Sequence, residues 1–525
     1  MSQYLGELKE RMGQLADIGH AAALAHWDQQ TMMPARGSAS RAEALATLAR
    51  IGHELFVDDE TGRLLEGADS ELNGRAGGRD PDSDDARLVL LTRRQWDKAR
   101  RVPSELAAEQ ARAASVGHEA WVAARAASDF AEFAPFLQHT IDLQRRYVEC
   151  HRDDPDFACA YDVLLDDYEP RISATEVAAL FDELKAELVP VIAQVAALPV
   201  IDDRALYERF PIDRQRRLVD EVTALMGFTG DGWRLDDTVH PFAILIGSGD
   251  VRITTRWDED FWSTGLYGAM HECGHGLYES GIAPRLMRTP LGEAESLGVH
   301  ESQSRLWENM VGRGRPFCGL LAPRIAELAG GTLAGLDADG LFAAVNRVKP
   351  TFIRVEADEA TYALHIVLRF ELEQALVDGS LSVAELPEAW NAAFEEYLGI
   401  KVTDDADGVL QDVHWSAGMF GYFPTYALGN LIAGQLWQRA HEDLSDLDSQ
   451  LAAGELSPLR EWLREHIHRH GAKFTTTELL ERATGGPIAV APYTSYLKAK
   501  LSTVYDLDLS VPRTGPQATI EEGGK

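Results

Sequence analysis

The sequence predicts a mainly α fold with one small β-sheet. Apolar residues recur at three-to-four spacing through most of the 525-residue chain, which is the pattern of amphipathic helices. A period of two, typical of a strand, is confined to a short stretch at 250–257. The chain is long enough to bury a large core without covalent links, and its four cysteines form no CxxC pair.

The helical segments are clearest at 173–198, where Ser173 and Glu176 form a capping box ahead of an apolar stripe. Comparable helical patterns occupy the ranges 104–150, 210–226, 334–346, 352–377, 385–399 and 426–453. The Gly-, Asp- and Ser-rich segment 66–86 is expected to be a solvent-exposed loop. The tail 511–525, which contains several Pro and Gly residues, is expected to fray.

The predicted strand belongs to a predicted hairpin. Apolar Val251, Ile253 and Trp257 alternate with polar residues, so one face of the strand is expected to be buried. A Gly-Ser-Gly turn at 247–249 separates this strand from the apolar segment 243–246, which we expect to be its partner. The sequence therefore predicts a small sheet just before residue 260.

Charge and hydropathy exclude several functional classes. The chain has 50 basic and 84 acidic residues, a formal net charge of −34. No basic stripe marks a nucleic-acid site, and an anionic membrane surface would repel the protein. The N-terminus has no signal-peptide pattern, and no apolar run is long enough to span a bilayer. Together with the few cysteines, these features predict a cytoplasmic, reducing location.

Residues 271–275 read His-Glu-Cys-Gly-His, an HExxH motif. On a helix, His271 and His275 share one face and can both bind one metal ion. Glu272 lies beside them, where it can take a proton from a metal-bound water. Cys273 points away at helical spacing and is expected to be a packing residue.

A catalytic metal usually takes three protein ligands. Downstream candidates for the third ligand are Glu293, Glu295, His300, Glu301 and Glu308. Spacing alone slightly favours Glu295, which follows His275 after a gap typical of thermolysin-type sites. The residues by themselves leave this choice open.

The motif at 271–275, followed by His-Glu-Ser-Gln at 300–303, resembles the carboxypeptidase Taq family of metallocarboxypeptidases. A Trp-Asp-Gln block at 27–29 resembles the opening block of that family. Further blocks match in the same order: His-Pro-Phe at 240–242, Asp-x-Arg-x-Thr at 250–254, Ile-Arg-x-x-Ala-Asp at 353–358 and Gly-x-x-Gln-Asp-x-His-Trp at 408–415. The resemblance covers about residues 5–505.

The resemblance implies that Glu301 is the third metal ligand and that the metal is Zn²⁺, with Co²⁺ also able to serve. It implies a large helical gluzincin (neurolysin-like) fold with a deep active-site cleft and a small sheet near the zinc helix. We expect one catalytic domain, 1–510, whose N-terminal helical region of about 1–110 acts as a lid. The implied activity is release of single residues from the C-terminus of peptides, with broad specificity, poor cleavage before a C-terminal Pro, and a homodimeric state.

Two arginines are candidate anchors for the C-terminal carboxylate of a substrate, because guanidinium binds carboxylate bidentately. Arg354, in the predicted helix 352–377, is favoured by the resemblance; its structural alternative is a surface pair with Asp358. Arg252 on the predicted strand is a rival, and its structural alternative is a salt bridge to Asp250 or Asp258. His240 and Tyr426 are also expected to bind substrate.

A neutral donor is needed to stabilise the oxyanion of the tetrahedral intermediate. Related helical gluzincins place a His and a Tyr downstream of the metal site, so we favour His414 and Tyr422, with Tyr426 close behind. Phe420 and Phe423 are interpreted as core residues. Metal-bound histidines usually donate their second N–H to a carboxylate or carbonyl oxygen. Gln411 and Asp412 are candidates for this acceptor, Asp250 and Asp358 are equal candidates, and the choice stays open.

Two other functions remain possible at this point. An endo-acting, thimet-like oligopeptidase would share the HExxH motif and the downstream His and Tyr, but would need no carboxylate anchor. A non-catalytic peptide-binding protein with a structural metal would need a site closed by four ligands, mostly Cys and His. The intact Glu272 argues against the second.

Overall fold

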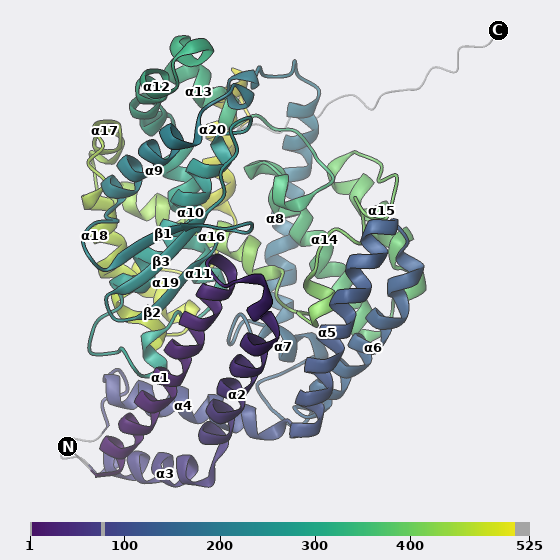
Figure 1. Ribbon diagram of the computed structural model, residues 1–525, viewed down its shortest axis with the longest axis vertical. Helices are drawn as coiled ribbons and strands as arrows, with labels where there is room; N and C mark the ends of the chain where they lie inside the picture. Colours follow the sequence, from purple (N-terminus) through teal and green to yellow (C-terminus); the bar gives the residue numbers. More distant parts are fainter. Residues whose placement is uncertain (1–2, 75–78, 510–525) are drawn as a thin grey trace.

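The computed structural model describes residues 3–74 and 79–509, and helices dominate this part of the chain (Figure 1). No helix among the described residues is long and apolar enough to cross a membrane. The mainly α architecture with one small sheet confirms the predicted fold class. The predicted frayed tail, 511–525, lies outside the described residues.

Four helices form the N-terminal region: α1 (Gln3–Thr31), α2 (Ser38–Val57), α3 (Asp59–Asn73) and α4 (Asp84–Arg101). They have a small apolar cluster of their own, made of Leu5, Leu8, Met12, Leu64, Leu65, Ala68, Leu72 and Val89. The prediction of a loop over 66–86 is wrong at both ends, because helices continue to Asn73 and resume at Asp84. Ala68 and Leu72 bury their side chains against α1, which the polar composition of the segment concealed. Residues 75–78 lie outside the described part.

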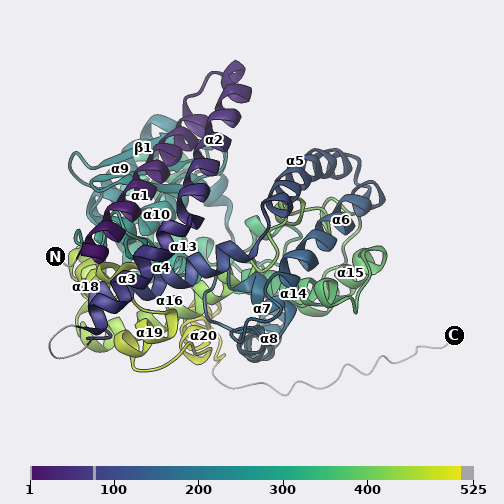
Figure 2. The ribbon, with the colours of Figure 1, turned by 90° about the horizontal axis from the view of Figure 1, so that it is seen from below.

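The next helices are α5 (Ser104–Ala127), α6 (Phe130–Glu149), α7 (Ala160–Leu165) and α8 (Ala174–Ala196). The helical predictions for 104–150 and 173–198 are confirmed, and so is the capping box of Ser173 and Glu176. Ser128 separates α5 from α6 in a left-handed conformation, with φ at 53°. In Figure 2, α1 and α2 lie on one side of the molecule and α5 and α6 on the other.

The sheet contains β1 (Trp233–Asp237), β2 (Ala243–Gly247) and β3 (Asp250–Thr255) in the order β1-β3-β2. β2 and β3 form the predicted antiparallel hairpin, with Leu245 opposite Val251. β1 pairs with β3 in parallel and was not predicted, because its sequence, Trp-Arg-Leu-Asp-Asp, is short and largely polar. The sheet packs on α10 (Ser263–Gly281), the helix of the HExxH motif.

Four further helices follow along the chain: α9 (Ile212–Met226), α11 (Leu297–Arg305), α12 (Arg315–Ala329) and α13 (Ala338–Val345). Of these, α9 and α11 pack against α10. α11 continues without a break into a π-helical turn, η4 (Leu306–Gly312). π-helical turns inside helices occur frequently at functional sites.

The C-terminal helices are α14 (Glu359–Asp378), α15 (Leu386–Leu398), α16 (Pro424–Asp443), α17 (Leu447–Ala453), α18 (Ser457–His466), α19 (Thr476–Thr484) and α20 (Ala491–Tyr505). The helix predicted at 352–377 begins only at Glu359, because the side chain of Asp358 caps it by accepting from the N–H groups of Ala360 and Thr361. Arg354 therefore lies in a short 3₁₀ turn, η6 (Arg354–Glu356), and not in the long helix. α16 packs against α11 in the core.

Candidate metal centre and active site

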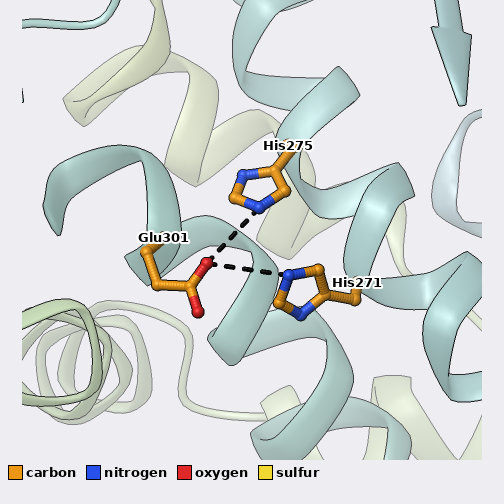
Figure 3. A group of neighbouring side chains, drawn as sticks. All are labelled: His271, His275 and Glu301. Atoms are coloured by element: carbon orange, nitrogen blue, oxygen red, sulfur yellow. Dashed lines mark ion pairs between the residues drawn. The ribbon is translucent and has the colours of Figure 1, made fainter. Parts of the chain in front are cut away.

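α10 places His271 and His275 on one face, one turn apart, as the motif predicts. Their rings are nearly perpendicular, with centroids 4.9 Å apart. Glu301, on α11, points its carboxylate at both rings (Figure 3). Its Oε2 lies 3.6 Å from Nε2 of His271 and 3.4 Å from Nε2 of His275. One candidate ligand atom from each residue lies within 4.8 Å of the other two.

The close approach of α11 to α10 depends on a glycine inside the motif. A Cβ atom on Gly274 would lie 2.8 Å from the carbonyl oxygen of Gln303 and 2.8 Å from Cα of Ser304. Any larger residue at this position would push α11 away from α10. Gly429 on α16 has the same role on the other side of α11, since a Cβ there would lie 2.7 Å from Cγ of Glu301.

The structure also shows where two other candidates for the third ligand lie. Glu295, which spacing favoured, lies outside this group, in the field of Arg171 and Arg94, and burial raises its pKa to about 8. Glu308 lies behind His271: its Oε2 is 2.8 Å from Nδ1 of that histidine. A proton on Nδ1, donated to Glu308, leaves the Nε2 lone pair directed at Glu301.

Glu308 is therefore the carboxylate that binds a histidine of the group, a role that the sequence analysis left open among other residues. Asp250 and Asp358 instead bind Arg252 and the start of α14. Glu308 follows Glu301 by seven residues, which is two helical turns on one face, and this spacing was the available signal. Arg313 donates to Glu308 over 2.6 Å and helps hold the pKa of its carboxyl well below the usual range, against the effect of burial.

Glu301 is held as a carboxylate by its own helix. Nε of Arg305 donates to Oε1 over 2.6 Å, and the hydroxyl of Ser304 donates to Oε2 over 3.0 Å. Burial opposes ionisation, but the charge of Arg305 keeps the pKa of Glu301 well below its usual range. Two imidazole nitrogens, one carboxylate oxygen and a carboxylate behind one imidazole form a donor set that fits a divalent metal ion.

Glu272 follows His271 on α10 and is 7% exposed. Burial raises the pKa of its carboxyl to about 7, although the neighbouring His271 acts in the opposite direction. Carboxyl groups with a pKa near neutrality are suited to general acid–base chemistry. Cys273 is fully buried and unpaired, which agrees with a packing role.

A second cluster contains His414, in the 3₁₀ turn η8 (His414–Ala417), Tyr422, two residues before α16, and Tyr426, in the first turn of α16. The ring centroids of His414 and Tyr422 are 5.3 Å apart, and the hydroxyl of Tyr426 donates to that of Tyr422 over 3.5 Å. Burial lowers the pKa of His414 to about 4, so that its ring is neutral at pH 7. Burial raises the pKa of Tyr422, and the charge of Glu301 adds to this shift. Both groups can therefore act as neutral donors.

Arg354 lies against this cluster, with its guanidinium over the ring of Tyr426, and is 5% exposed. Its Nε and Nη2 atoms both donate to Oδ1 of Asp412, over 3.0 and 2.8 Å, and its Nη1 donates to the hydroxyl of Tyr362 over 3.0 Å. The alternative pairing with Asp358 is thus wrong, because Asp358 caps α14. Arg369, fully buried, binds the other oxygen of Asp412. One carboxylate therefore balances two guanidinium groups, which leaves one positive charge.

Other predicted site residues lie elsewhere or have structural partners. Arg252 binds Asp250 through two hydrogen bonds of 2.8 and 2.7 Å and stacks over the ring of Trp27. His240 lies in an exposed bend between β1 and β2. Phe420 and Phe423 are buried, as interpreted from the sequence.

Two residues near the cluster were missed by the sequence analysis. Tyr362 on α14 links the two halves of the site, because Arg305 stacks over its ring and Arg354 donates to its hydroxyl. Arg369 also lies on α14 and reaches Asp412 from the opposite side. Neither residue belongs to a matched block, and only folding brings them to the site.

The sequence as a whole matches a known family of enzymes. The model of the carboxypeptidase Taq (M32) metallopeptidases matches residues 7–501. The chain therefore belongs to the carboxypeptidase Taq family and is a metallocarboxypeptidase, which confirms the resemblance seen in the sequence.

Individual relatives agree with this assignment. The chain is 42% identical to thermostable carboxypeptidase 1 of Thermus thermophilus, over 96% of this chain and 98% of that protein. It is 36% identical to carboxypeptidase 1 of Bacillus subtilis, over 96% and 99%. The crystal structure of the M32 carboxypeptidase from Deinococcus radiodurans superposes with a TM-score of 0.92 at 37% identity, covering 96% of this chain and all of that chain.

Proposed function

We propose that this metallocarboxypeptidase removes single residues from the free C-terminus of peptides, with one zinc ion held by His271, His275 and Glu301. The observation that carries the proposal is the convergence of these three side chains, within 4.8 Å, next to Glu272. Bound zinc supplies Lewis-acid chemistry, because it polarises a carbonyl oxygen and lowers the pKa of water. Cobalt would suit the same donor set.

Glu272 acts as the general base. It takes a proton from the attacking water and passes the proton to the nitrogen of the leaving residue. Its burial supports this role, since a carboxyl group with a pKa of about 7 can both accept and return a proton near neutrality.

His414 and Tyr422 stabilise the oxyanion of the tetrahedral intermediate. The neutral imidazole and the phenol, with ring centroids 5.3 Å apart, offer two donors from one loop. The charge of Glu301 helps raise the pKa of Tyr422, which supports the closeness of this phenol to the metal group.

Arg354 anchors the C-terminal carboxylate of the substrate. The single positive charge left by Arg354, Arg369 and Asp412 supports this role, because it attracts an anion to a site that is otherwise largely buried. Tyr426, beside Arg354, and the exposed His240 contact the remaining parts of the peptide. Arg252 is the weaker anchor, because Asp250 already occupies its donors.

Mass-spectrometric time courses test the proposal. Wild type and Glu272→Gln are given one peptide with a free C-terminus and the same peptide with an amidated C-terminus. Stepwise loss of single residues from the free acid alone, by wild type alone, supports it. Chelation should abolish this activity and added zinc should restore it.

The same experiment separates the oligopeptidase alternative. Equal internal cleavage of both peptides, unchanged in Arg354→Ala, would contradict the carboxypeptidase mechanism proposed for Arg354. Arg354→Lys is the matched control, because it keeps the charge and loses the bidentate geometry. A peptide ending in Pro, compared with one ending in Ala, tests the proposed broad specificity and the poor cleavage before Pro.

We also propose that the enzyme acts as a cytoplasmic homodimer with an N-terminal lid of about residues 1–110. The separate apolar cluster of α1, α3 and α4 supports a lid that moves as a unit. Analytical ultracentrifugation tests the dimer: a single species of monomer mass at micromolar concentration would contradict it.

A further inference from the structure

Glu373 is a fully buried carboxylate on α14 that has no role in the function proposed above. Burial raises its pKa to about 7, and its hydrogen-bond partners act in the opposite direction. A charged group in such a place is costly unless it is well hydrogen-bonded. The groups that bind it therefore indicate what it does.

All three groups that contact Glu373 are donors. The indole Nε1 of Trp415 donates to Oε1 over 2.8 Å. The hydroxyl of Tyr161 and the backbone N–H of Gly421 donate to Oε2, over 2.6 and 3.0 Å. A carboxylate can accept all three bonds, and two of the three groups, the indole of Trp415 and the backbone N–H of Gly421, can only donate.

Two of these donors adjoin the proposed catalytic donors in the chain. Trp415 directly follows His414, and Gly421 directly precedes Tyr422. One carboxylate thus binds both ends of the segment 414–422.

The segment is also pressed against α7, the helix that carries Tyr161. Gly421 has a φ of 85°, and a Cβ atom there would lie 2.5 Å from the carbonyl carbon of Leu164. Inside the segment, the rings of Trp415 and Phe420 stack with centroids 6.2 Å apart. Its ends therefore have little room to move once Glu373 has bound them.

We infer that Glu373 is a positioning residue for peptide hydrolysis: by binding Trp415 and Gly421 it fixes His414 and Tyr422 relative to one another. The inference rests on the proposed function, because it takes these two residues to be the donors to the oxyanion. Glu373 touches neither substrate nor metal and acts only through the segment 414–422.

Glu373→Gln is the first test. The amide keeps the size of the side chain, but its NH₂ group must face either the indole or the backbone N–H, which can only donate. We expect kcat on a free-acid peptide to fall about 10²-fold, as for other small displacements of catalytic groups. KM should stay within about threefold, because binding of the ground state is unaffected.

Glu371→Gln is the matched control. Glu371 lies on the same helix but binds Lys185 and the hydroxyl of Tyr397, away from the segment 414–422. Its kcat and KM should equal those of wild type. An equal fall of kcat in both variants would show a general effect of altering α14 and would overturn the inference.

A double-mutant cycle with Tyr422→Phe shows whether Glu373 acts through the catalytic segment. In the Tyr422→Phe background, Glu373→Gln should lower kcat by about tenfold or less, since one of the two donors that it positions is already gone and only the placement of His414 is still lost. The same large factor in both backgrounds overturns the inference, and so does an unchanged kcat in Glu373→Gln when Tyr422→Phe is impaired. If neither Tyr422→Phe nor His414→Gln lowers kcat, the proposed oxyanion donors are wrong and the inference fails with them.

Tyr161→Phe keeps the inference testable if Glu373→Gln does not fold. It removes one hydroxyl on α7 and leaves the carboxylate and the segment 414–422 intact. We expect kcat to fall about tenfold with KM unchanged, because one of three bonds to the carboxylate is lost. A kcat equal to that of wild type in a folded Tyr161→Phe protein would overturn the inference.

Discussion

The N-terminal helices and the helices around the candidate metal centre are held in different ways. α1, α3 and α4 pack around a small cluster of eight buried residues, whereas α10, α11, α14 and α16 share the main core. Ion pairs join the N-terminal region to the rest: Arg288 with Asp17 and Arg285 with Asp84 are largely half-exposed, whereas Arg94 and Lys98 of α4 meet the buried Asp166. Close packing of backbones, as at Gly274, holds the centre itself.

This difference indicates which region of the molecule can move without loss of the site geometry. A metal site needs its ligand atoms fixed to within a fraction of an ångström, so it is built where helices touch. A region attached through polar contacts can move without disturbing that geometry. The comparison predicts that changes in the two regions have separable effects on catalysis and on stability.

The largest effect is expected at Gly274. Gly274→Val would force α10 and α11 apart, move Glu301 from the histidines and lower kcat/KM by about 10²-fold or more. Overpacking should also destabilise the protein by about 3 kcal/mol. Activity assays and urea denaturation measure both quantities. A fully active, stable Gly274→Val protein would contradict the close approach as the origin of the site.

A cavity in the N-terminal cluster should affect stability alone. Leu65→Ala removes a fully buried side chain and should cost about 3 kcal/mol of local stability. Hydrogen exchange should rise in α1, α3 and α4, with kcat unchanged. An equal rise of exchange in α10 and α11 would contradict the separate behaviour of the two regions.

A smaller, pH-dependent effect is expected at Glu169, which accepts the N–H of Gly298 at the start of α11. Burial raises the pKa of Glu169 from 4.5 to about 8, so the native protein favours the protonated form. Its contribution to stability is thus complete below about pH 4.5 and is lost as the pH rises through 8.

Glu169→Gln removes this dependence. Between pH 6 and 8, wild type should lose about 2 kcal/mol more of its free energy of unfolding than the variant does. Denaturation curves at both pH values measure the difference. Parallel losses in the two proteins would show that Glu169 does not titrate in this range.

The smallest effect is expected at the ion pair between the regions. Asp17→Asn removes the pairing with Arg288, whose side chain is more than half exposed. Exposed pairs contribute little, so global stability should be unchanged within error. Hydrogen exchange in α1 should increase slightly at low salt and match that of wild type at high salt, where screening already weakens the pair. A large loss of stability would show that ion pairs dominate the attachment.

Local patterns in the sequence were sufficient to predict much of the fold. The capping box of α8, the β2–β3 hairpin and the helix carrying His271 and His275 depend on residues close together in the chain. β1 was missed because its pairing with β3 supplies what its own polar sequence does not. The composition of 66–86 likewise hid the buried face of α3.

The site was predictable only where motifs mark it. Spacing alone favoured Glu295, and the matched block was needed to choose Glu301, because the approach of α11 to α10 is a property of the packed helices. The pairing of Arg354 with Asp412 spans 58 residues, and no periodic pattern reveals it. Glu373 was missed for the same reason, since its partners come from α7 and from the segment 414–422.

The pairing of Asp412 with two arginines has a consequence for turnover. Arg354 already gives two of its donors to Asp412, so a substrate carboxylate bound in the proposed way would meet a cation that is partly satisfied. Its affinity for that carboxylate would be moderate. The released amino acid also carries a carboxylate, so the same moderate affinity would apply to the product. An anchor tuned in this way would let the product leave quickly, so that free amino acids accumulating during digestion would inhibit the enzyme only weakly.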